Sequence, residues 1–174
     1  MTDFLSDNAM AGHHEMDPSE VVLIVDDLPD NCELIDRYLR KHGYVTESCY
    51  SGAAAIARVS EIRPKLILLD WMMPGLSGFY TLVAIREIHS DDAVPIIMCT
   101  AIDEDVSVVN ALRSGANDYV TKPINFSVML ARIETQLGRV AKMQELSSDK
   151  QELEKALTQR TAALLKASRN DGKS

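Results

Sequence analysis

The chain has 174 residues, which is room for one full domain with a sizeable core and an appendage. Its hydrophobic content of 46% and charged content of 25% are typical of a soluble globular protein. A formal net charge of −8 argues against direct binding to nucleic-acid phosphates, and the apolar runs are too short to span a membrane.

Cysteine usage and the N-terminus indicate where the protein works. The three cysteines lack metal-type spacing and favour a reduced compartment. The first residues lack a positively charged region followed by an apolar one, so they are not a secretory signal. We therefore expect a cytoplasmic protein. Residues 1–19 are polar and include Gly12 and Pro18, and we interpret them as a disordered tail.

From residue 20 onward, short β-rich runs alternate with helical patterns. The run VVLIV at 21–25 is continuously apolar, as expected for a strand buried on both faces. Pro29 opens the first helical pattern and Gly43 follows its end, where these residues are favoured. We predict strands at 21–25, 44–48, 66–69, 95–99 and 118–121, and helices at 29–41, 52–62, 78–89, 103–114 and from about 125. Five such cycles predict an α/β fold with a doubly wound, mostly parallel sheet and helices on both faces.

The last helical pattern continues beyond what one side of the sheet needs. Its leucines are spaced by seven, four and seven residues in a heptad-like stripe: Leu146, Leu153, Leu157 and Leu164. Lys150 and Arg160 occupy other positions of this seam, and the segment 147–149 is a candidate start of a second helix. We interpret residues 141–174 as a helical, coiled-coil extension with a frayed end that packs on a partner helix.

Four of the predicted strands end in polar side chains that suit phosphoryl chemistry. Asp26 and Asp27 end the first apolar run, and Asp70 ends that of the third strand. Thr100 closes the run of the fourth strand, and Lys122 follows the fifth. Because the carboxyl ends of parallel strands meet at one edge, these side chains are expected to lie together where open α/β folds bind ligands.

Three carboxylates at one edge call for a cation. Two of them about 4 Å apart repel by several kcal/mol at an effective dielectric constant of about 20, and oxygen ligands with partial hydration suit Mg²⁺. A carboxylate can act as a nucleophile and form an acyl phosphate, while Lys122 and Thr100 compensate charge. Taken singly, the paired aspartates are also typical of a helix cap, and Thr100 and Lys122 of turns. Their joint arrangement favours a magnesium-dependent, phosphoryl-accepting site.

These segments resemble the response-regulator receiver domain of bacterial two-component signalling. The resemblance covers about residues 20–140 and implies a flavodoxin-like (βα)5 receiver fold with an extended C-terminal helix. The motifs that carry it are LIVDD (23–27), LILLDWMMPGLSG (66–78), VPIIMCTA (94–101) and GANDYVTKP (115–123).

The resemblance also implies roles for individual residues. Asp70 would take a phosphoryl group from a histidine kinase or phosphotransfer protein. Asp27, Asp70 and the backbone carbonyl of Met72 would bind Mg²⁺ directly, and Asp26 would act largely through water. Lys122 would pair with the phosphate, and the peptide bond between Lys122 and Pro123 would be cis.

Signal output is likewise an expectation from the resemblance. Thr100 and Tyr119 would be the switch pair, with the hydroxyl moving toward the phosphoryl group and the ring turning inward. The face formed by the fourth helix, the fifth strand and the last helix would then change, and a homodimer would form through this face and the last helix. Met72 and Ile102 are apolar and lie two positions after Asp70 and Thr100, which implies slow self-dephosphorylation. Trp71 adjoins Asp70 and is expected to report on the site.

Two other functions are compatible with parts of the sequence. A phosphohydrolase using Asp70 as nucleophile would need a second acid two residues later, and Met72 stands there. An interaction module that works without phosphorylation would not need all five site residues. The start DDLPDN and the long helix also resemble receivers that precede an effector such as a nucleotide cyclase or a kinase. The sequence leaves open whether the chain is a stand-alone regulator or a fragment cut before its effector.

Overall fold

The computed structural model describes residues 20–91, 93–101 and 105–171, without the side chains of 105–108 and 163–171. The predicted tail at 1–19, the side chains of Ile102 and Leu164, and the predicted start of the fourth helix at 103 lie outside the described residues.

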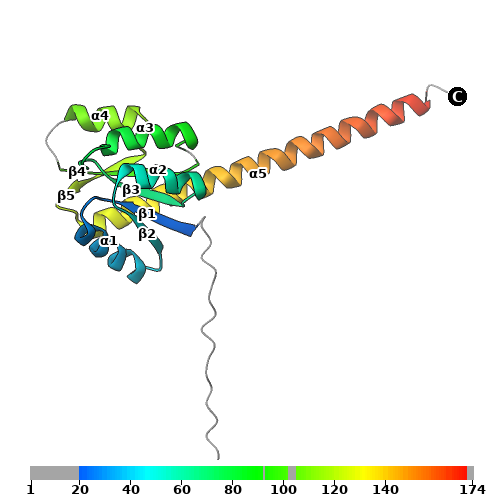
Figure 1. Cartoon of the computed structure of the whole chain (residues 1–174). Coiled ribbons are helices and arrows are strands. Elements are labelled where there is room, and N and C mark those ends of the chain that lie inside the picture. Colours follow the sequence, from blue (N-terminus) through cyan, green and yellow to red (C-terminus); the bar gives the residue numbers. More distant parts are fainter. Residues whose placement is uncertain (1–19, 92, 102–104, 172–174) are drawn as a thin grey trace, which may run out of the picture.

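The described part of the chain alternates strands and helices (Figure 1). The strands are β1 (Val21–Val25), β2 (Val45–Cys49), β3 (Leu66–Asp70), β4 (Ile96–Ala101) and β5 (Asp118–Lys122). The helices are α1 (Pro29–Lys41), α2 (Gly52–Glu61), α3 (Gly78–Ile88), α4 (Asp105–Arg113) and α5 (Phe126–Asp171). All strand pairings are parallel, in the order β2-β1-β3-β4-β5, which confirms the predicted doubly wound sheet.

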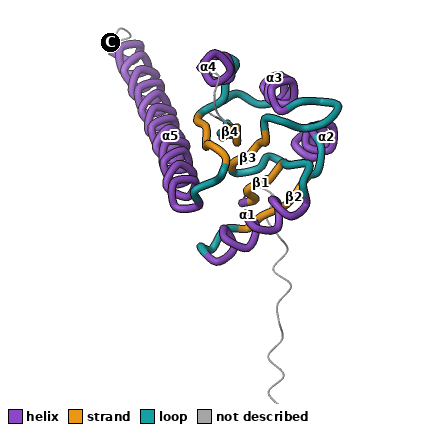
Figure 2. The backbone as a smooth tube through the Cα atoms, turned by 90° about the vertical axis from the view of Figure 1, so that its left-hand side faces the viewer, coloured by secondary structure: helices purple, strands orange, loops and turns teal. Residues whose placement is uncertain are grey.

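Each face of the sheet has its own hydrophobic core. Figure 2 shows α2, α3 and α4 over one face and α1 and α5 over the other. Leu23 and Ile24 are neighbours in β1 but belong to different cores, because successive side chains of a strand point to opposite faces. Full burial of one leucine or isoleucine side chain stabilises by about 1.5–3 kcal/mol, so the two cores hold the sheet as a rigid base for its edge.

Strand β4 ends two residues later than the sequence predicts, and β2, β3 and β5 each end one residue later. The pairs between Thr100 and Thr121 and between Ala101 and Lys122 continue the parallel ladder between β4 and β5. Thr100 and Lys122 are therefore strand residues with backbones fixed by the sheet, whereas the predicted strands stopped at residues 99 and 121. Elsewhere the predicted boundaries agree with the structure to within one residue, apart from α4, whose first residues are not described.

The expected restart of a helix at 147–149 is wrong. Helix α5 runs without interruption from Phe126 to Asp171 over 46 residues, and Figure 1 shows it leaving the sheet as one rod. Residues 139–171 contain neither glycine nor proline, so no residue in this segment breaks the backbone hydrogen-bond ladder. Despite its length, no helix among the described residues has the apolar character that crossing a bilayer requires.

The reactivity of the three buried cysteines can be used to test how tightly the two cores are packed. Burial raises the pKa of Cys32 to about 11 and that of Cys99 to about 12, and burial also raises the pKa of Cys49. We therefore expect negligible reaction with a water-soluble disulfide reagent at pH about 8, where ordinary thiols are partly ionised. All three thiols should react after unfolding in guanidinium chloride. Rapid labelling of the native protein would show that one of the cores is open.

Candidate functional site

The predicted carboxylates meet at the carboxyl edge of the central strands. Asp26 directly follows β1, and Asp70 is the last residue of the neighbouring strand β3. Both side chains are buried, whereas Asp27 is half-buried. One oxygen from each of the three carboxylates lies within 4.8 Å of the others, a donor set that fits a hard divalent cation such as Mg²⁺.

Lys122 is the cation of this cluster in the structure. Its Nζ lies 2.9 Å from Oδ2 of Asp26 and 2.7 Å from Oδ1 of Asp70. Its long side chain reaches these two carboxylates from β5, although β4 separates this strand from β3. Three carboxylates and one ammonium leave two negative charges in a partly dehydrated site. That excess is what a bound divalent cation would neutralise.

The carboxylate of Asp26 is further fixed by the start of α1. The Leu28 amide donates to Oδ1 at 2.9 Å, and Asn31 Nδ2 lies 3.1 and 3.0 Å from the two carboxylate oxygens. Sequence analysis did not assign Asn31 to the site. The available signal was its position in the first turn of the helix that begins directly after the paired aspartates.

Burial and charge act in opposite directions on the two groups that would handle a phosphoryl group. Burial raises the pKa of Asp70, and the nearby charge of Asp26 adds to this, while the hydrogen bonds from Lys122 and from the Met72 amide oppose it. For Lys122, burial lowers the pKa, but the hydrogen bonds and charges of Asp70 and Asp26 together raise it. The lysine is therefore held in its ammonium form beside both carboxylates.

The predicted switch residues lie beside the cluster without joining it. Thr100 is buried on β4, and its hydroxyl donates to the Ala101 carbonyl over a long 3.4 Å. Among the described residues, no hydrogen bond connects it to the carboxylates or to Lys122. Tyr119 is half-buried on β5, one strand further out.

Arg132 on α5 contacts both of the first two residues of β5, and sequence analysis did not single it out. Its guanidinium carbon lies 5.4 Å from the centre of the Tyr119 ring, and its Nη1 forms an ion pair with Asp118. Because successive side chains of a strand alternate, Asp118 and Tyr119 belong to opposite faces of the sheet. Arg132 therefore connects α5 to two neighbouring residues of the edge strand.

The loop after Asp70 holds the remaining predicted residues. Met72 is 69% exposed, whereas Trp71 is half-buried and its ring lies 5.8 Å from that of Phe79. An added Cβ at Gly78 would lie 2.0 Å from the Asp70 carbonyl oxygen, so only glycine lets α3 start this close to the site. The peptide bond between Lys122 and Pro123 is cis, as expected.

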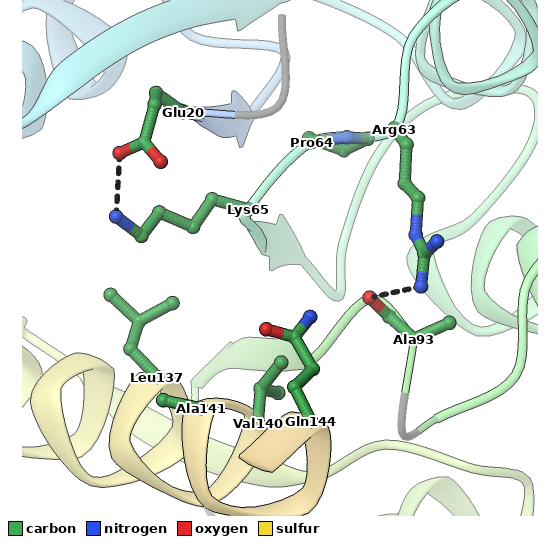
Figure 3. Close-up of a pocket in the computed structure, with 9 residues that line it drawn as sticks. All are labelled: Glu20, Arg63, Pro64, Lys65, Ala93, Leu137, Val140, Ala141 and Gln144. Carbon is green, nitrogen blue, oxygen red and sulfur yellow. Dashed lines mark hydrogen bonds and ion pairs between the residues drawn. The ribbon is translucent and has the colours of Figure 1, made fainter. Parts of the chain in front are cut away.

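A cavity also lies at the opposite edge of the sheet. It has a volume of about 280 Å³ and lies between α5 and the segments before β1, β3 and β4 (Figure 3). Lys65 Nζ is paired there with Glu20 at 2.6 Å, and Arg63 reaches the Ala93 carbonyl at 3.5 Å. It contains neither paired carboxylates nor another arrangement for phosphoryl transfer, so the site remains at the carboxyl edge.

Comparisons with known proteins agree with this geometry. The family model "Response regulator receiver domain" matches residues 22–134. The DNA-binding response regulator MtrA of Mycolicibacterium smegmatis is 41% identical over 118 residues, which are 68% of this chain and 50% of MtrA. The regulatory protein VanRc of Enterococcus gallinarum is 38% identical over 121 residues, 70% of this chain and 51% of VanRc. The chain thus spans about half the length of these relatives.

Solved structures give the same result for the fold. A two-component response regulator from Clostridium difficile superposes with a TM-score of 0.64 at 31% identity, covering 68% of this chain and 96% of its own. The receiver domain of Francisella response regulator 1452 gives a TM-score of 0.64 at 28% identity, with 69% and 98% covered. The chain therefore belongs to the response regulator receiver domain family.

Proposed function

We propose that the chain is a phosphorylation-activated response regulator with Asp70 as the phosphoacceptor. The observation that carries this proposal is the buried Asp70 carboxylate, which lies 2.7 Å from the Lys122 ammonium and next to two further carboxylates. Residues 20–140 would form the receiver, and residues 141–174 would form its helical extension. We expect the protein to act in the cytoplasm.

The proposed reaction moves a phosphoryl group between two side chains. The phosphorus–nitrogen bond of a phosphohistidine on a histidine kinase or phosphotransfer protein breaks, and an Asp70 oxygen forms the new phosphorus–oxygen bond. The histidine nitrogen keeps the electron pair of the broken bond. Lys122 turns its ammonium toward the transferred phosphoryl oxygens, for which it is already placed beside Asp70.

The acidic cluster is the expected magnesium site. Asp27, Asp70 and the carbonyl of Met72 would hold Mg²⁺ directly, with Asp26 acting largely through water. When bound, the ion supplies positive charge to the phosphoryl oxygens during transfer. Without such a cation, an incoming phosphoryl group would meet a site that already has two uncompensated negative charges.

The phosphodonor needs a surface next to Lys122, and an apolar one is present. Leu28 and Leu34 are 55% and 45% exposed. A cavity of about 250 Å³ between α1 and the start of α5 is lined by Asn31, Leu34, Ile35, Lys122, Pro123, Ile124 and Phe126. Because this apolar surface ends at Lys122, we infer that the histidine-bearing partner docks on α1 and on the loop after β5.

Output would begin at Thr100 and Tyr119. Within the described part of the chain, the Thr100 hydroxyl would leave a single long local hydrogen bond when it turns toward a phosphoryl group. Inward rotation of Tyr119 would withdraw its ring from Arg132 and change how β5 holds α5. The α4-β5-α5 face and the extension of α5 are the proposed homodimer surfaces, and an effector domain outside this chain is the alternative recipient of the signal.

A multiple-turnover phosphohydrolase is the less supported function. Met72 stands where such an enzyme needs a second acid, and its exposed thioether cannot transfer a proton to a leaving group. A stoichiometric switch needs no such acid. The curated relatives described above are regulators, which agrees with a switch.

Phosphorylation of Asp70 can be tested directly with a small phosphodonor. Incubation with acetyl phosphate and Mg²⁺ should give one hydroxylamine-sensitive phosphoryl group per chain. Asp70→Asn should abolish it, and Asp30→Asn, on the exposed first turn of α1, should not. Because Met72 is apolar, the acyl phosphate should persist for many minutes after donor removal. Labelling of Asp70→Asn would refute the acceptor, and a lifetime of seconds would refute the slow hydrolysis.

Magnesium binding should be visible in the fluorescence of Trp71, the only tryptophan. We expect a saturable change on titration with Mg²⁺ and a further change with beryllofluoride. Asp27→Asn should weaken Mg²⁺ binding by at least about tenfold, since it removes a carboxylate ligand. Asp30→Asn is the matched control with the same loss of one negative charge. Equal weakening by both variants would indicate a general charge effect instead of coordination.

Arg132 should couple the switch to α5. Arg132→Ala removes one partly exposed ion pair and one contact with an aromatic ring, so we expect a loss of about 0.5–2 kcal/mol in unfolding free energy. Acetyl phosphate should still label Asp70. In Arg132→Ala, the ratio between the dimer dissociation constants with and without beryllofluoride should be closer to one than in wild type, as measured by light scattering. Lys142→Ala, on the exposed part of α5, should leave the ratio unchanged.

A further inference from the structure

The cavity at the edge of the sheet opposite to the phosphoryl site has an apolar wall and a charged rim. Its volume is about 280 Å³, and α5 supplies the apolar wall with Leu137, Val140 and Ala141. These residues share one side of the helix, because the second and third lie three and four positions after the first. Figure 3 shows their side chains across the cavity from Lys65. An occupant of the cavity would therefore contact α5 where the helix leaves the sheet (Figure 1).

The rim of the cavity has an excess of positive charge. Lys65 Nζ is paired with Glu20 at 2.6 Å. The Arg63 guanidinium contacts the neutral carbonyl of Ala93 over a long 3.5 Å. Within the described part of the chain, no carboxylate other than that of Glu20 lines the cavity. Because a carbonyl does not neutralise a guanidinium, a further carboxylate is favoured beside Arg63.

We propose that residues 13–19 of the same chain bind in this cavity and connect the segment before β1 to the departing part of α5. These residues lie outside the described part of the chain. They directly precede Glu20, which itself lines the cavity. The segment therefore starts from the rim of the site that it is proposed to fill.

The composition of the segment complements the cavity. Residues 1–19 contain four carboxylates and neither lysine nor arginine. Asp17 is the carboxylate closest to the rim along the chain, and it is the proposed partner of Arg63. Met16 precedes it, and a methionine side chain adapts to irregular apolar spaces such as the one beside α5.

The covalent connection favours this segment over any other acidic occupant. Asp17 is three residues before Glu20, and three residues span at most about 11 Å. So short a tether gives an effective concentration in the millimolar range, at which weak contacts suffice for binding. The same segment of a second copy, or an acidic peptide of another protein, would offer similar chemistry without this advantage.

Binding of the segment would oppose movement of α5. The filled cavity would join this helix to the segments that precede β1, β3 and β4, at the edge of the sheet away from Asp70. A shift of α5 would then have to break these contacts. That the segment restrains the switch in this way rests on the proposed function, whereas its binding in the cavity does not.

Disulfide formation tests whether the segment lies in the cavity. Met16→Cys with Gln144→Cys in the full chain should form a disulfide within one chain, because Gln144 lines the cavity from α5. The three native cysteines are buried, so the introduced thiols are the reactive ones. The matched control is Met16→Cys with Lys142→Cys, since Lys142 is exposed on α5 and does not line the cavity. The pair with Gln144→Cys should react at least about tenfold faster than the control pair.

Two results would contradict this assignment. Equal rates for the two cysteine pairs would overturn binding in the cavity. A disulfide between two chains, identified by its mass, would overturn binding within one chain and assign the cavity to the segment of a second copy.

Charge reversal tests the contact with Arg63. In the chain with Met16→Cys and Gln144→Cys, Arg63→Glu should slow disulfide formation about two- to fivefold at low salt, as expected for one exposed ion pair. Asp17→Arg combined with Arg63→Glu should restore the rate. Arg37→Glu is the matched control, because Arg37 is exposed on α1 and does not line the cavity. An unchanged rate in Arg63→Glu, or equal slowing in Arg37→Glu, would overturn the ion pair.

The effect on the switch is measured with the same disulfide. Beryllofluoride with Mg²⁺ should change its rate of formation at least about twofold, and Asp70→Asn should remove this change. An unchanged rate would refute the restraint on the switch. If acetyl phosphate does not label Asp70 but the disulfide still forms selectively, binding in the cavity stands and the proposed function fails. If Asp70 is labelled while the two cysteine pairs react equally, the proposed function stands and binding in the cavity is refuted.

Discussion

The arrangement of the site depends on one electrostatic constraint, the confinement of three carboxylates at the edge of a parallel sheet. Two of them, Asp26 and Asp70, are buried, and the ammonium of Lys122 lies within 3 Å of both. A single monovalent cation leaves the cluster with excess negative charge. The resting site is therefore held together by a group that a divalent cation and a phosphoryl group would each draw into a new position.

The buried sheet holds the three carboxylates in place despite their mutual repulsion. Strands β1 and β3 are buried on both faces and pair in register up to Val25 and Leu69, so the carboxylates that follow are placed by the two cores. Asn31 and the Leu28 amide add hydrogen bonds to Asp26 from the start of α1. Packing energy distributed over the cores thus offsets a local repulsion that would otherwise open the edge. The proposed phosphorylation would change the charge at this edge without changing the sheet and cores that support it.

Much of this was predictable because it depends on local patterns. Continuous apolar runs predict buried strands, and the polar residues at their ends predict a site wherever the strands are parallel. The order of the strands in the sheet could not be predicted in this way, because no local pattern between residues 21 and 70 indicates that β1 lies between β2 and β3. The structure supplies that order.

Two of the misses share a physical cause. Asn31 and Arg132 act through contacts between separate helices and strands, and neither residue stands out in the sequence pattern. The false restart at 147–149 came from weighing a weak capping signal above the absence of any helix-breaking residue in 139–171. Cap signals indicate where a helix can begin, but they do not end one that is already propagating.

Strand β5 connects the site to the long helix over a short distance. Lys122 binds the acidic cluster, Tyr119 lies three residues earlier, and α5 begins four residues later. Arg132 contacts both Asp118 and Tyr119 from α5, so the proposed rotation of the Tyr119 ring would directly change a contact of the helix that leaves the domain. Because α5 continues unbroken to Asp171, the proposed switch would carry a small change in the position of α5 on the sheet along the whole helix.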